Sequence, residues 1–236
     1  ILRKRRISIL ILAFYGFLAF GCGIYYRLTS DMRKKENFYI LDAEHEWERV
    51  SYAEALELQQ QLAADGTSGW LLFSPRPTIT LGRRASSLDL LAPAETLRLS
   101  GIDILQVDRG GLVTYHGPGQ LVLFPIGKLE QHAASSRGVK EFVCASLHWI
   151  KHFSEDQWKQ YPSGQSLQIS NNESLAGIWN TAGEKLCSVG IRFTRERLSH
   201  GFALNLSSEV RRGFEWINPC GQAGAKTTSL YLERDL

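Results

Sequence analysis

The sequence predicts an α+β protein with a mixed, largely antiparallel sheet and flanking helices. Helical and strand-like segments follow one another without the regular β-α alternation that a doubly wound parallel sheet requires. Of the 236 residues, 44% are hydrophobic and 22% are charged, which is ordinary for a globular domain and sufficient for one sizeable core. Local patterns along the chain support this fold class element by element.

The first half of the chain contains two predicted helices and three predicted strands. Ser51 and Glu54 have the spacing of a capping box, which predicts a helix start at Ser51. Apolar residues recur at helical spacing after it, and Gly66 predicts its end. Next come predicted strands at 70–73 and 78–81 around a proline-containing turn, a short helix at 93–99 and a strand at 102–107.

The second half continues the mixture of elements. A predicted strand at 121–126 precedes a helix at 139–153 whose apolar residues share one face. Residues 185–193 alternate between two sets of side chains, which is typical of a strand, and residues 202–206 form a further predicted strand. Between these, the Gln, Ser and Asn clusters of residues 155–173 predict an excursion on the surface.

Charge and cysteine content exclude several classes of protein. The formal net charge of +3 is mild, and no basic helix with interleaved aromatic residues is present, so we predict no nucleic-acid binding. The cysteines Cys22, Cys144, Cys187 and Cys220 contain no C-x-x-C pair, which excludes a zinc ribbon and a dithiol redox motif. We predict no metal site, and unpaired thiols fit a reducing compartment.

The N-terminal segment, residues 1–35, is hydrophobic. Residues 7–26 carry no charged side chain, and a helix of that length spans roughly 30 Å, about one bilayer core. This predicts either a membrane anchor or a stretch that precedes the true start of the protein, since Met32 is the only methionine. Basic residues flank the stretch equally, so the orientation stays open. We expect the principal domain to cover residues 37–236.

Residues 109–120, with the sequence RGGLVTYHGPGQ, form the most unusual segment. Their glycines allow positive φ and close approach of the backbone to a ligand. The segment is neither a Walker A loop nor a dinucleotide fingerprint, because no G-x-x-x-x-G-K-[ST] exists and a strand follows Gly119. Exposed backbone N–H groups without a phosphate signature fit an acyl carbonyl, or the oxyanion that forms on it. A tight structural loop is the alternative.

Three later segments contain further candidates. Lys185 begins an apolar strand, GEKLCSVGIR, and residues 199–205, SHGFALN, contain a second compact glycine site. In INPCG, Cys220 lies between a proline and a glycine, where a cysteine is more often exposed than one in a helix such as Cys144. Taken singly, Lys185 is also consistent with a snorkelling lysine and Cys220 with a structural thiol.

Together these segments, in the order R-G-G-x-x-T-Y-H-G-P-G-Q, K-x-x-S-x-G-x-R, H-G-x-A-L-N and I-N-P-C-G, resemble the lipoyl(octanoyl) transferases over residues 48–230. The resemblance implies a fold similar to that of the biotin and lipoate protein ligases. It also implies transfer of an octanoyl or lipoyl group from acyl carrier protein to a lysine of lipoyl domains. Such domains occur in 2-oxoacid dehydrogenase complexes and in the glycine cleavage H protein. No cofactor, metal or nucleotide is implied.

By the same resemblance, Cys220 and Lys185 are the catalytic residues. A thiolate can accept an acyl group and release it to an amine, so a thioester on Cys220 divides the reaction into two easier steps. A free thiol with a pKa of about 8.5 is mostly protonated at neutral pH, and a nearby Lys185 ammonium would favour the thiolate. Once neutral, the same lysine could accept a proton from the incoming amine.

The resemblance also implies an acyl pocket. Its predicted residues are Arg109, Gly110, Gly111, Leu112, Val113, Thr114, Tyr115, His116, Ser188, Val189, Gly190, Gly201, Phe202 and Ala203. For His116 and for His200, a purely structural role is the alternative. A docking role is expected for the arginines near the catalytic motifs, because acyl carrier proteins are acidic; these are Arg192, Arg195, Arg197, Arg211 and Arg212.

Other functions remain open at this point. An ATP-dependent lipoate or biotin ligase would need phosphate-binding signatures and would not need Cys220. A non-catalytic, membrane-tethered acyl-binding protein would not need both Cys220 and Lys185 at their motif positions. A thioesterase would release free acid without an acceptor. We expect a cytoplasmic enzyme, because both substrates of the family are cytoplasmic; anchoring to a membrane through residues 7–26 is the alternative.

Overall fold

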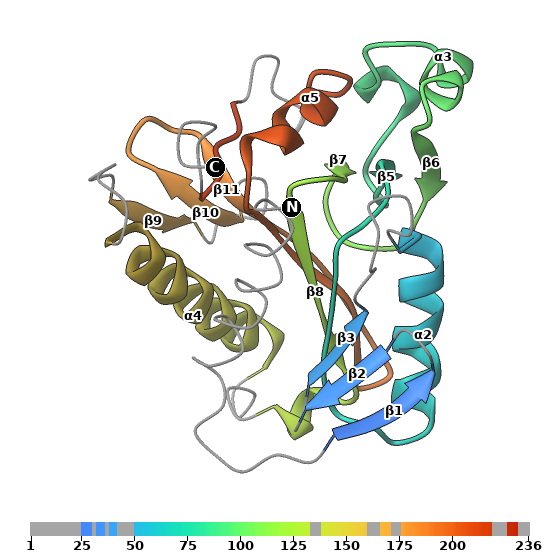
Figure 1. The fold of residues 1–236 in the computed structure, drawn as a ribbon, viewed down its shortest axis with the longest axis vertical. Coiled ribbons are helices and arrows are strands. Elements are labelled where there is room, and N and C mark those ends of the chain that lie inside the picture. Colours follow the sequence, from blue (N-terminus) through green and yellow to red (C-terminus); the bar gives the residue numbers. More distant parts are fainter. Residues whose placement is uncertain are drawn as a thin grey trace.

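A nine-stranded mixed sheet organises the protein (Figure 1). The computed structural model describes residues 25–29, 32–35, 38–41, 50–132, 138–159, 166–170, 176–218 and 226–230. The strand order is β1-β2-β3-β4-β8-β12-β11-β10-β9, and every neighbouring pair is antiparallel except β3 and β4. The strands are β1 (Tyr25–Thr29), β2 (Met32–Lys35), β3 (Phe38–Leu41), β4 (Gly69–Phe73), β8 (Gln120–Ile126), β9 (Leu167–Ser170), β10 (Gly177–Asn180), β11 (Lys185–Thr194) and β12 (Arg197–Asn205). The predicted α+β class with a largely antiparallel sheet is confirmed.

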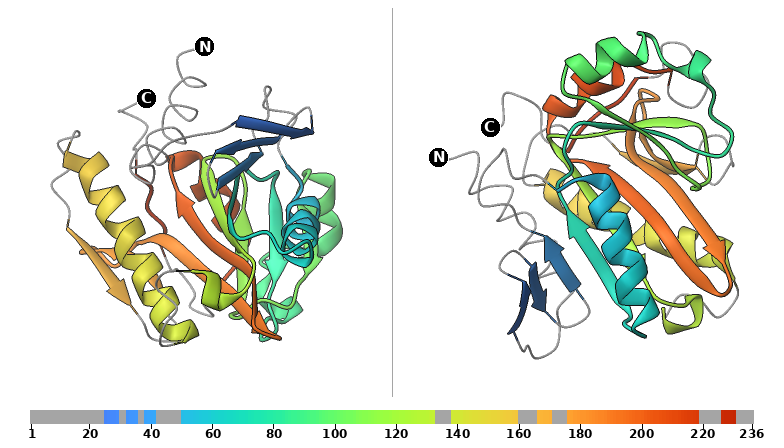
Figure 2. Two further views of the ribbon diagram at one scale, coloured as in Figure 1. Left: turned by 90° about the horizontal axis from the view of Figure 1, so that it is seen from below. Right: turned by 90° about the vertical axis from the view of Figure 1, so that its right-hand side faces the viewer.

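Two helices cover opposite faces of this sheet, as Figure 2 shows. They are α2 (Tyr52–Ala64) and α4 (Val139–Lys159). Strand β8 lies between them with all of its residues buried, and successive side chains point to opposite faces. Leu121 and Leu123 pack in the core cluster that contains the apolar residues of α4, whereas Val122 and Phe124 pack in the cluster that contains those of α2. The sheet is therefore covered on both sides at its centre.

The start and end of α2 follow from local chemistry. The backbone N–H of Ser51 donates to Glu54 Oε2 over 3.2 Å, which satisfies a donor that the helix itself leaves unpaired. Gly66 has a φ of +79°, a left-handed conformation that glycine adopts without strain, and its N–H donates to Ala63 O. The predicted helix is confirmed, and its capped start places Tyr52 at the first helical position.

A small second sheet packs against the large one. Its order is β6-β5-β7, formed by β5 (Thr78–Leu81), β6 (Asp103–Gln106) and β7 (Val113–His116). Helices α3 (Ala94–Leu99) and α5 (Arg211–Phe214) complete this part, together with 3-10 turns at Ser87–Asp89 and Ser208–Val210. A further 3-10 turn, Leu129–Gln131, follows β8 and contacts the turn between β11 and β12. A Cβ at Gly213 would lie 2.0 Å from the Tyr115 ring, so α5 approaches β7 closely only because this residue is glycine.

One expectation needs correction. Residues 155–173 were expected to form a surface excursion, but α4 continues to Lys159 and β9 covers Leu167–Ser170. The first strand of the large sheet begins at Tyr25, and the domain boundary at residue 37 stays a prediction. The hydrophobic residues 7–26 lie outside the described part except Tyr25 and Tyr26, which begin β1. Within the described ranges, no helix is long and apolar enough to cross a membrane.

Candidate active site

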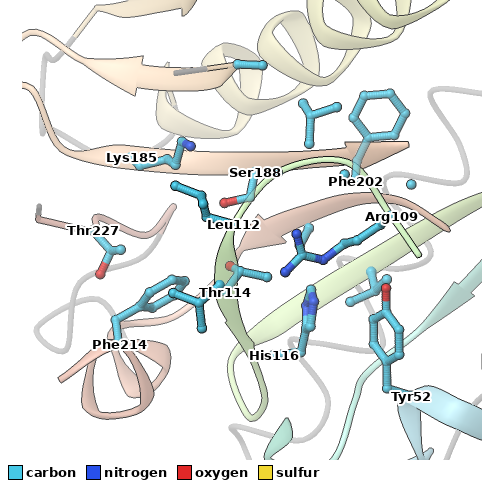
Figure 3. Close-up of a pocket in the computed structure, with 18 of the residues that line it drawn as sticks. Tyr52, Arg109, Leu112, Thr114, His116, Lys185, Ser188, Phe202, Phe214 and Thr227 are labelled. Atoms are coloured by element: carbon cyan, nitrogen blue, oxygen red, sulfur yellow. The ribbon is translucent and has the colours of Figure 1, made fainter. Parts of the chain in front are cut away.

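A pocket lies between the large sheet, the 109–116 segment and the start of α2 (Figure 3). The structure brings every residue of the predicted acyl pocket to its wall except Gly110 and Tyr115, and Lys185 lines it as well. Tyr115 turns away into the core of the small sheet, where its ring packs against Phe214 with a centroid separation of 5.9 Å. The wall also contains residues that no motif indicated: Tyr52, Arg84, Val122, Phe124, Ala176, Trp179, Phe214, Lys226 and Thr227.

Arg109 forms a rigid part of the pocket wall and is only 4% exposed. Its Nε and Nη2 donate to Thr80 Oγ1, Nη2 also donates to Thr80 O over 2.7 Å, and Nη1 donates to Gly110 O. A Cβ at Gly190 would lie 2.8 Å from Arg109 Cδ, so the glycine on β11 provides the space in which this side chain lies. The R-G-G motif and the later glycine therefore serve one packing arrangement.

His116 is a buried and neutral residue of the wall. Burial lowers the pKa of His116 to about 3, and the nearby Arg109 charge lowers it further in the same direction. Nδ1 lies 2.9 Å from Gln120 Oε1, which can only accept, and Nε2 lies 3.3 Å from Thr80 Oγ1. This geometry assigns the proton to Nδ1. An imidazole that is neutral and hydrogen-bonded at both nitrogens positions its neighbours, and it does not supply positive charge to the pocket.

A chain of hydrogen bonds joins His116 to the backbone at Lys185. Gln120 Nε2 donates to Asn205 Oδ1 over 2.9 Å. Asn205 Nδ2 donates to Lys185 O over 3.3 Å and to Thr228 O over 3.0 Å. Asn205 is 2% exposed, so its own amide would be left unsatisfied in the interior if these bonds were broken. Asn205 thus holds the start of β11 against residues 226–230.

Lys185 is buried, with 8% exposure, although its position at a strand start was also consistent with a snorkelling surface lysine. Its Nζ lies 4.7 Å from the centroid of the Trp179 ring, within the range of a cation–π interaction. A Cβ at Gly177 would lie 3.1 Å from Lys185 Cε, so this glycine leaves room for the lysine stem. The backbone of Lys185 donates to Lys226 O and accepts from Thr228 N–H.

Cys220 lies outside the described residues, as do Pro219 and Gly221. The described chain on one side of it ends at Asn218, whose N–H donates to Asp89 O, and resumes on the other side at Lys226, which lines the pocket. Neither of the described cysteines lines the pocket. Burial raises the pKa of the Cys187 thiol to about 12, which keeps that thiol protonated and makes it a poor nucleophile.

His200 does not line the pocket but supports Tyr52, which does. Nε2 of His200 lies 2.7 Å from Asp108 Oδ1, and Nδ1 lies 3.0 Å from the Tyr52 hydroxyl. Burial lowers the pKa of His200 although Asp108 opposes the shift. Partial burial acts to raise the pKa of Asp108, but the hydrogen bond from His200 and the charge of Arg192 hold it below its usual value. The position of His200 behind Tyr52 therefore fits a purely structural role, the alternative to a role in the acyl pocket.

The pocket combines an apolar floor with a positive charge balance. Buried Val122, Phe124, Phe202 and Ala203 form much of the floor. Among the described lining residues, Arg84, Arg109, Lys185 and Lys226 carry positive charge, and none is Asp or Glu. Apolar walls suit an alkyl chain, and nearby cations favour a thiolate or an oxyanion over the neutral form.

The topology of this α+β domain places the protein in the fold class of the lipoate protein ligases. A lipoate-protein ligase A crystal structure with bound ATP matches the fold with a TM-score of 0.52 at 8% identity, over 74% of this chain and 70% of the other. At that identity the likeness supports the fold alone.

Sequence comparison then gives the family. The model of the lipoyl protein ligase A/B catalytic domain matches residues 51–232. The octanoyltransferase of Acidobacterium capsulatum is 36% identical over 195 residues, which cover 78% of this chain and 77% of that protein. That of Chloroflexus aurantiacus is also 36% identical, over 78% of this chain and 81% of its own. The chain belongs to the lipoyl protein ligase A/B family, among the octanoyltransferases, so the predicted family and acyltransferase class are confirmed.

Proposed function

We propose that this enzyme transfers an octanoyl group from acyl carrier protein to a lysine of lipoyl domains through a thioester on Cys220. The observation that carries the proposal is the buried Lys185 at the pocket wall, bonded through its backbone to Lys226 and Thr228, which follow Cys220 closely in the chain. This pairing brings the chain that follows Cys220 back to the lysine. The acceptors we propose are lipoyl domains of 2-oxoacid dehydrogenase complexes and the glycine cleavage H protein.

The reaction proceeds in two acyl transfers. The Cys220 thiolate attacks the donor carbonyl, a tetrahedral oxyanion forms and collapses, and the carrier thiolate leaves and takes a proton from the Lys185 ammonium, which becomes neutral. The acceptor amine then attacks the Cys220 thioester, Lys185 accepts the proton that this nitrogen loses, and the Cys220 thiolate leaves. The positive charge of the pocket stabilises the thiolate and both oxyanions.

The floor of the pocket suits the alkyl part of the substrate. Val122, Phe124 and Phe202 are each almost fully buried, have apolar side chains and line the pocket. Transfer of a methylene group from water to such a surface is favourable by about 0.8 kcal/mol. A medium-length chain therefore gains enough affinity from burial alone to be held while its carbonyl reacts near Lys185.

Intact-mass analysis after incubation with octanoyl-acyl carrier protein tests the proposal. We expect a mass gain of one octanoyl group that hydroxylamine removes. Cys220→Ser should abolish the gain, whereas Cys144→Ser and Cys187→Ser should retain it, because neither of those thiols lines the pocket. Turnover of Cys220→Ser near the wild-type rate would show that the mechanism is wrong.

The same assay separates transfer from ligation and hydrolysis. Transfer from octanoyl-acyl carrier protein without ATP supports the proposal, and a requirement for free acid and ATP supports a ligase instead. Release of octanoate without an acceptor indicates a thioesterase.

We also propose a cytoplasmic place of action, because acyl carrier protein and lipoyl domains are cytoplasmic substrates. Fractionation of cells that express the natural gene tests this against anchoring through residues 7–26.

A further inference from the structure

We propose that Tyr52 is the end wall of the acyl pocket and sets the longest acyl chain that the enzyme accepts. Figure 3 shows Lys185 and Thr227 toward one end of the pocket and Tyr52 at the other, with Arg109 and His116 between them. If the reacting carbonyl lies beside Lys185, as the proposed function requires, the alkyl chain extends toward Tyr52. The inference rests on the proposed function in this one respect.

Contacts on several sides hold the Tyr52 ring in place. The side chain is 1% exposed, and its hydroxyl donates to His200 Nδ1 over 3.0 Å. One face of the ring stacks on His116 with a centroid separation of 4.7 Å. The rings of Phe73 and Phe124 meet it edge-on, with centroid separations of 6.4 and 5.4 Å. A ring packed in this way cannot turn aside for a longer chain without losing a buried hydrogen bond.

The support behind Tyr52 is rigid as well. His200 has a φ of +57°, a left-handed conformation that is uncommon for a non-glycine residue. The Gln59 side chain maintains it, because Oε1 accepts from His200 N–H over 2.9 Å and Nε2 donates to His200 O over 3.1 Å. Nε2 of His200 in turn bonds to Asp108. The end wall is therefore a ring backed by an imidazole whose backbone and side chain are both anchored.

Chain-length profiles of four variants test the inference. The measurement is kcat/KM for acyl transfer from carrier-bound donors with acyl chains of increasing length. In Tyr52→Leu the shorter side chain opens the end of the pocket, so we expect the optimum to move to longer chains and the preference for octanoyl over dodecanoyl to fall at least tenfold. Tyr52→Phe keeps the ring and should keep the wild-type optimum.

A matched control removes a ring from elsewhere in the same pocket. Phe214 lies near Thr227, toward the Lys185 end (Figure 3). Phe214→Leu is expected to change rates for all donors together and to leave the optimum where it is. Equal shifts in Tyr52→Leu and Phe214→Leu would mean that general loosening of the pocket, and not an end wall, controls chain length.

A fourth variant, His200→Asn, changes the residue behind the Tyr52 ring and keeps the inference testable if Tyr52→Leu does not fold. His200→Asn tolerates the left-handed backbone and vacates space behind the Tyr52 ring, so longer chains should again be accepted. If the wild type transfers octanoyl but a folded, active Tyr52→Leu or His200→Asn keeps the wild-type profile, the inference is overturned. If the wild type transfers no acyl chain of any length, the proposed function fails instead.

Discussion

At the scale of single residues, the buried polar side chains of the pocket depend most strongly on their hydrogen-bond partners. His116 is 4% exposed and neutral, and Arg109 beside it is charged and equally buried. Each is tolerated because Thr80 accepts from the guanidinium and lies within hydrogen-bonding distance of the imidazole. One threonine hydroxyl thus connects two of the residues that the motifs indicated.

The pH dependence of stability reports on His116. The unfolded chain takes up a proton on this residue near pH 6.5, whereas the folded protein does so only near pH 3. The free energy of unfolding should therefore fall as the pH is lowered from about 6.5 toward 3, by up to about 1.4 kcal/mol per pH unit for this one group. Urea unfolding at several pH values should show a flatter dependence for His116→Gln, and an equal slope would contradict the assignment.

Lys185 permits a prediction for the reactivity of Cys220. If the lysine ammonium favours the thiolate, Lys185→Ala should raise the pH midpoint for alkylation of Cys220 by iodoacetamide and should slow octanoyl transfer by 10²-fold or more. Trp179→Leu, which removes the ring under the ammonium but keeps the charge, is the matched variant and should affect the midpoint less. An unchanged midpoint in Lys185→Ala would restrict the lysine to the later proton transfer.

Two glycines of the pocket wall should differ in their tolerance of a side chain. A Cβ at Gly201 would lie 2.0 Å from Leu123 O, a backbone atom of the neighbouring strand. A Cβ at Gly190 would lie 2.8 Å from Arg109 Cδ, so a smaller displacement would relieve this contact than the one at Gly201. We expect Gly201→Ala to lose roughly 3 kcal/mol or more of unfolding free energy and Gly190→Ala about 1 kcal/mol, which chemical denaturation measures. The reverse order would show that Arg109 is the less adaptable neighbour.

At the scale of elements, Asn205 links strands that carry different motifs. It joins Gln120 on β8 to the start of β11 and to Thr228. Asn205→Ala should cost about 1–3 kcal/mol because Thr228 O loses the Asn205 donor and the buried Gln120 amide loses the Asn205 acceptor. If Asn205 also positions the catalytic segments, acylation of Cys220 should slow even at temperatures where the variant is fully folded. Leu97→Ala, a core change on α3 away from these bonds, should lose stability without that loss of rate.

The same scale shows which parts of the fold the sequence could predict. Helices α2 and α4 and strand β8 were predicted because a cap, a helical periodicity or a continuous apolar run defines each of them within the local sequence. Strand β7 was missed inside the glycine-rich segment, because its pairing with β5 defines it. For β10, the partners are β9 and β11, and nothing in Gly177–Asn180 alone indicates them.

Prediction of the site shows a similar division. The predicted acyl-pocket residues lie on the pocket wall, apart from Gly110 and Tyr115, because the glycine-rich segment and strands β11 and β12 that contain them border the pocket. The sequence did not predict Tyr52, Phe124 and Trp179 as pocket residues, because an aromatic side chain in a helix or strand is usually part of the core. Their place in the pocket depends on how α2, β8 and β10 pack, which is tertiary information.

At the scale of the whole molecule, the expected arginine patch divides into two. Arg195 and Arg197 belong to the turn and start of the β11–β12 hairpin, whereas Arg211 and Arg212 lie on α5, after the opposite end of β12. The nine residues of β12 span about 26 Å at the usual rise of a strand. Arg192 is paired with Asp108. The five arginines are close in sequence but do not form one patch, because the turn of a hairpin lies a full strand length away from its open end.

Only one of these groups lies beside the pocket, since Phe214 of the same short helix as Arg211 and Arg212 lines it. Both arginines are exposed, so they are positioned to attract an acidic carrier protein to the entrance. Arg211→Glu with Arg212→Glu should raise the KM for octanoyl-acyl carrier protein about tenfold, and less so at high salt, because exposed charges are screened.

The matched control is Arg195→Glu with Arg197→Glu, which makes the same change in charge at the turn of the hairpin and should leave this KM unaltered. A small octanoyl thioester donor should be turned over equally by both double variants, and equal losses with both donors would indicate misfolding. Equal effects of the two pairs on the carrier-bound donor would show that net charge, and not a docking site at α5, governs the encounter.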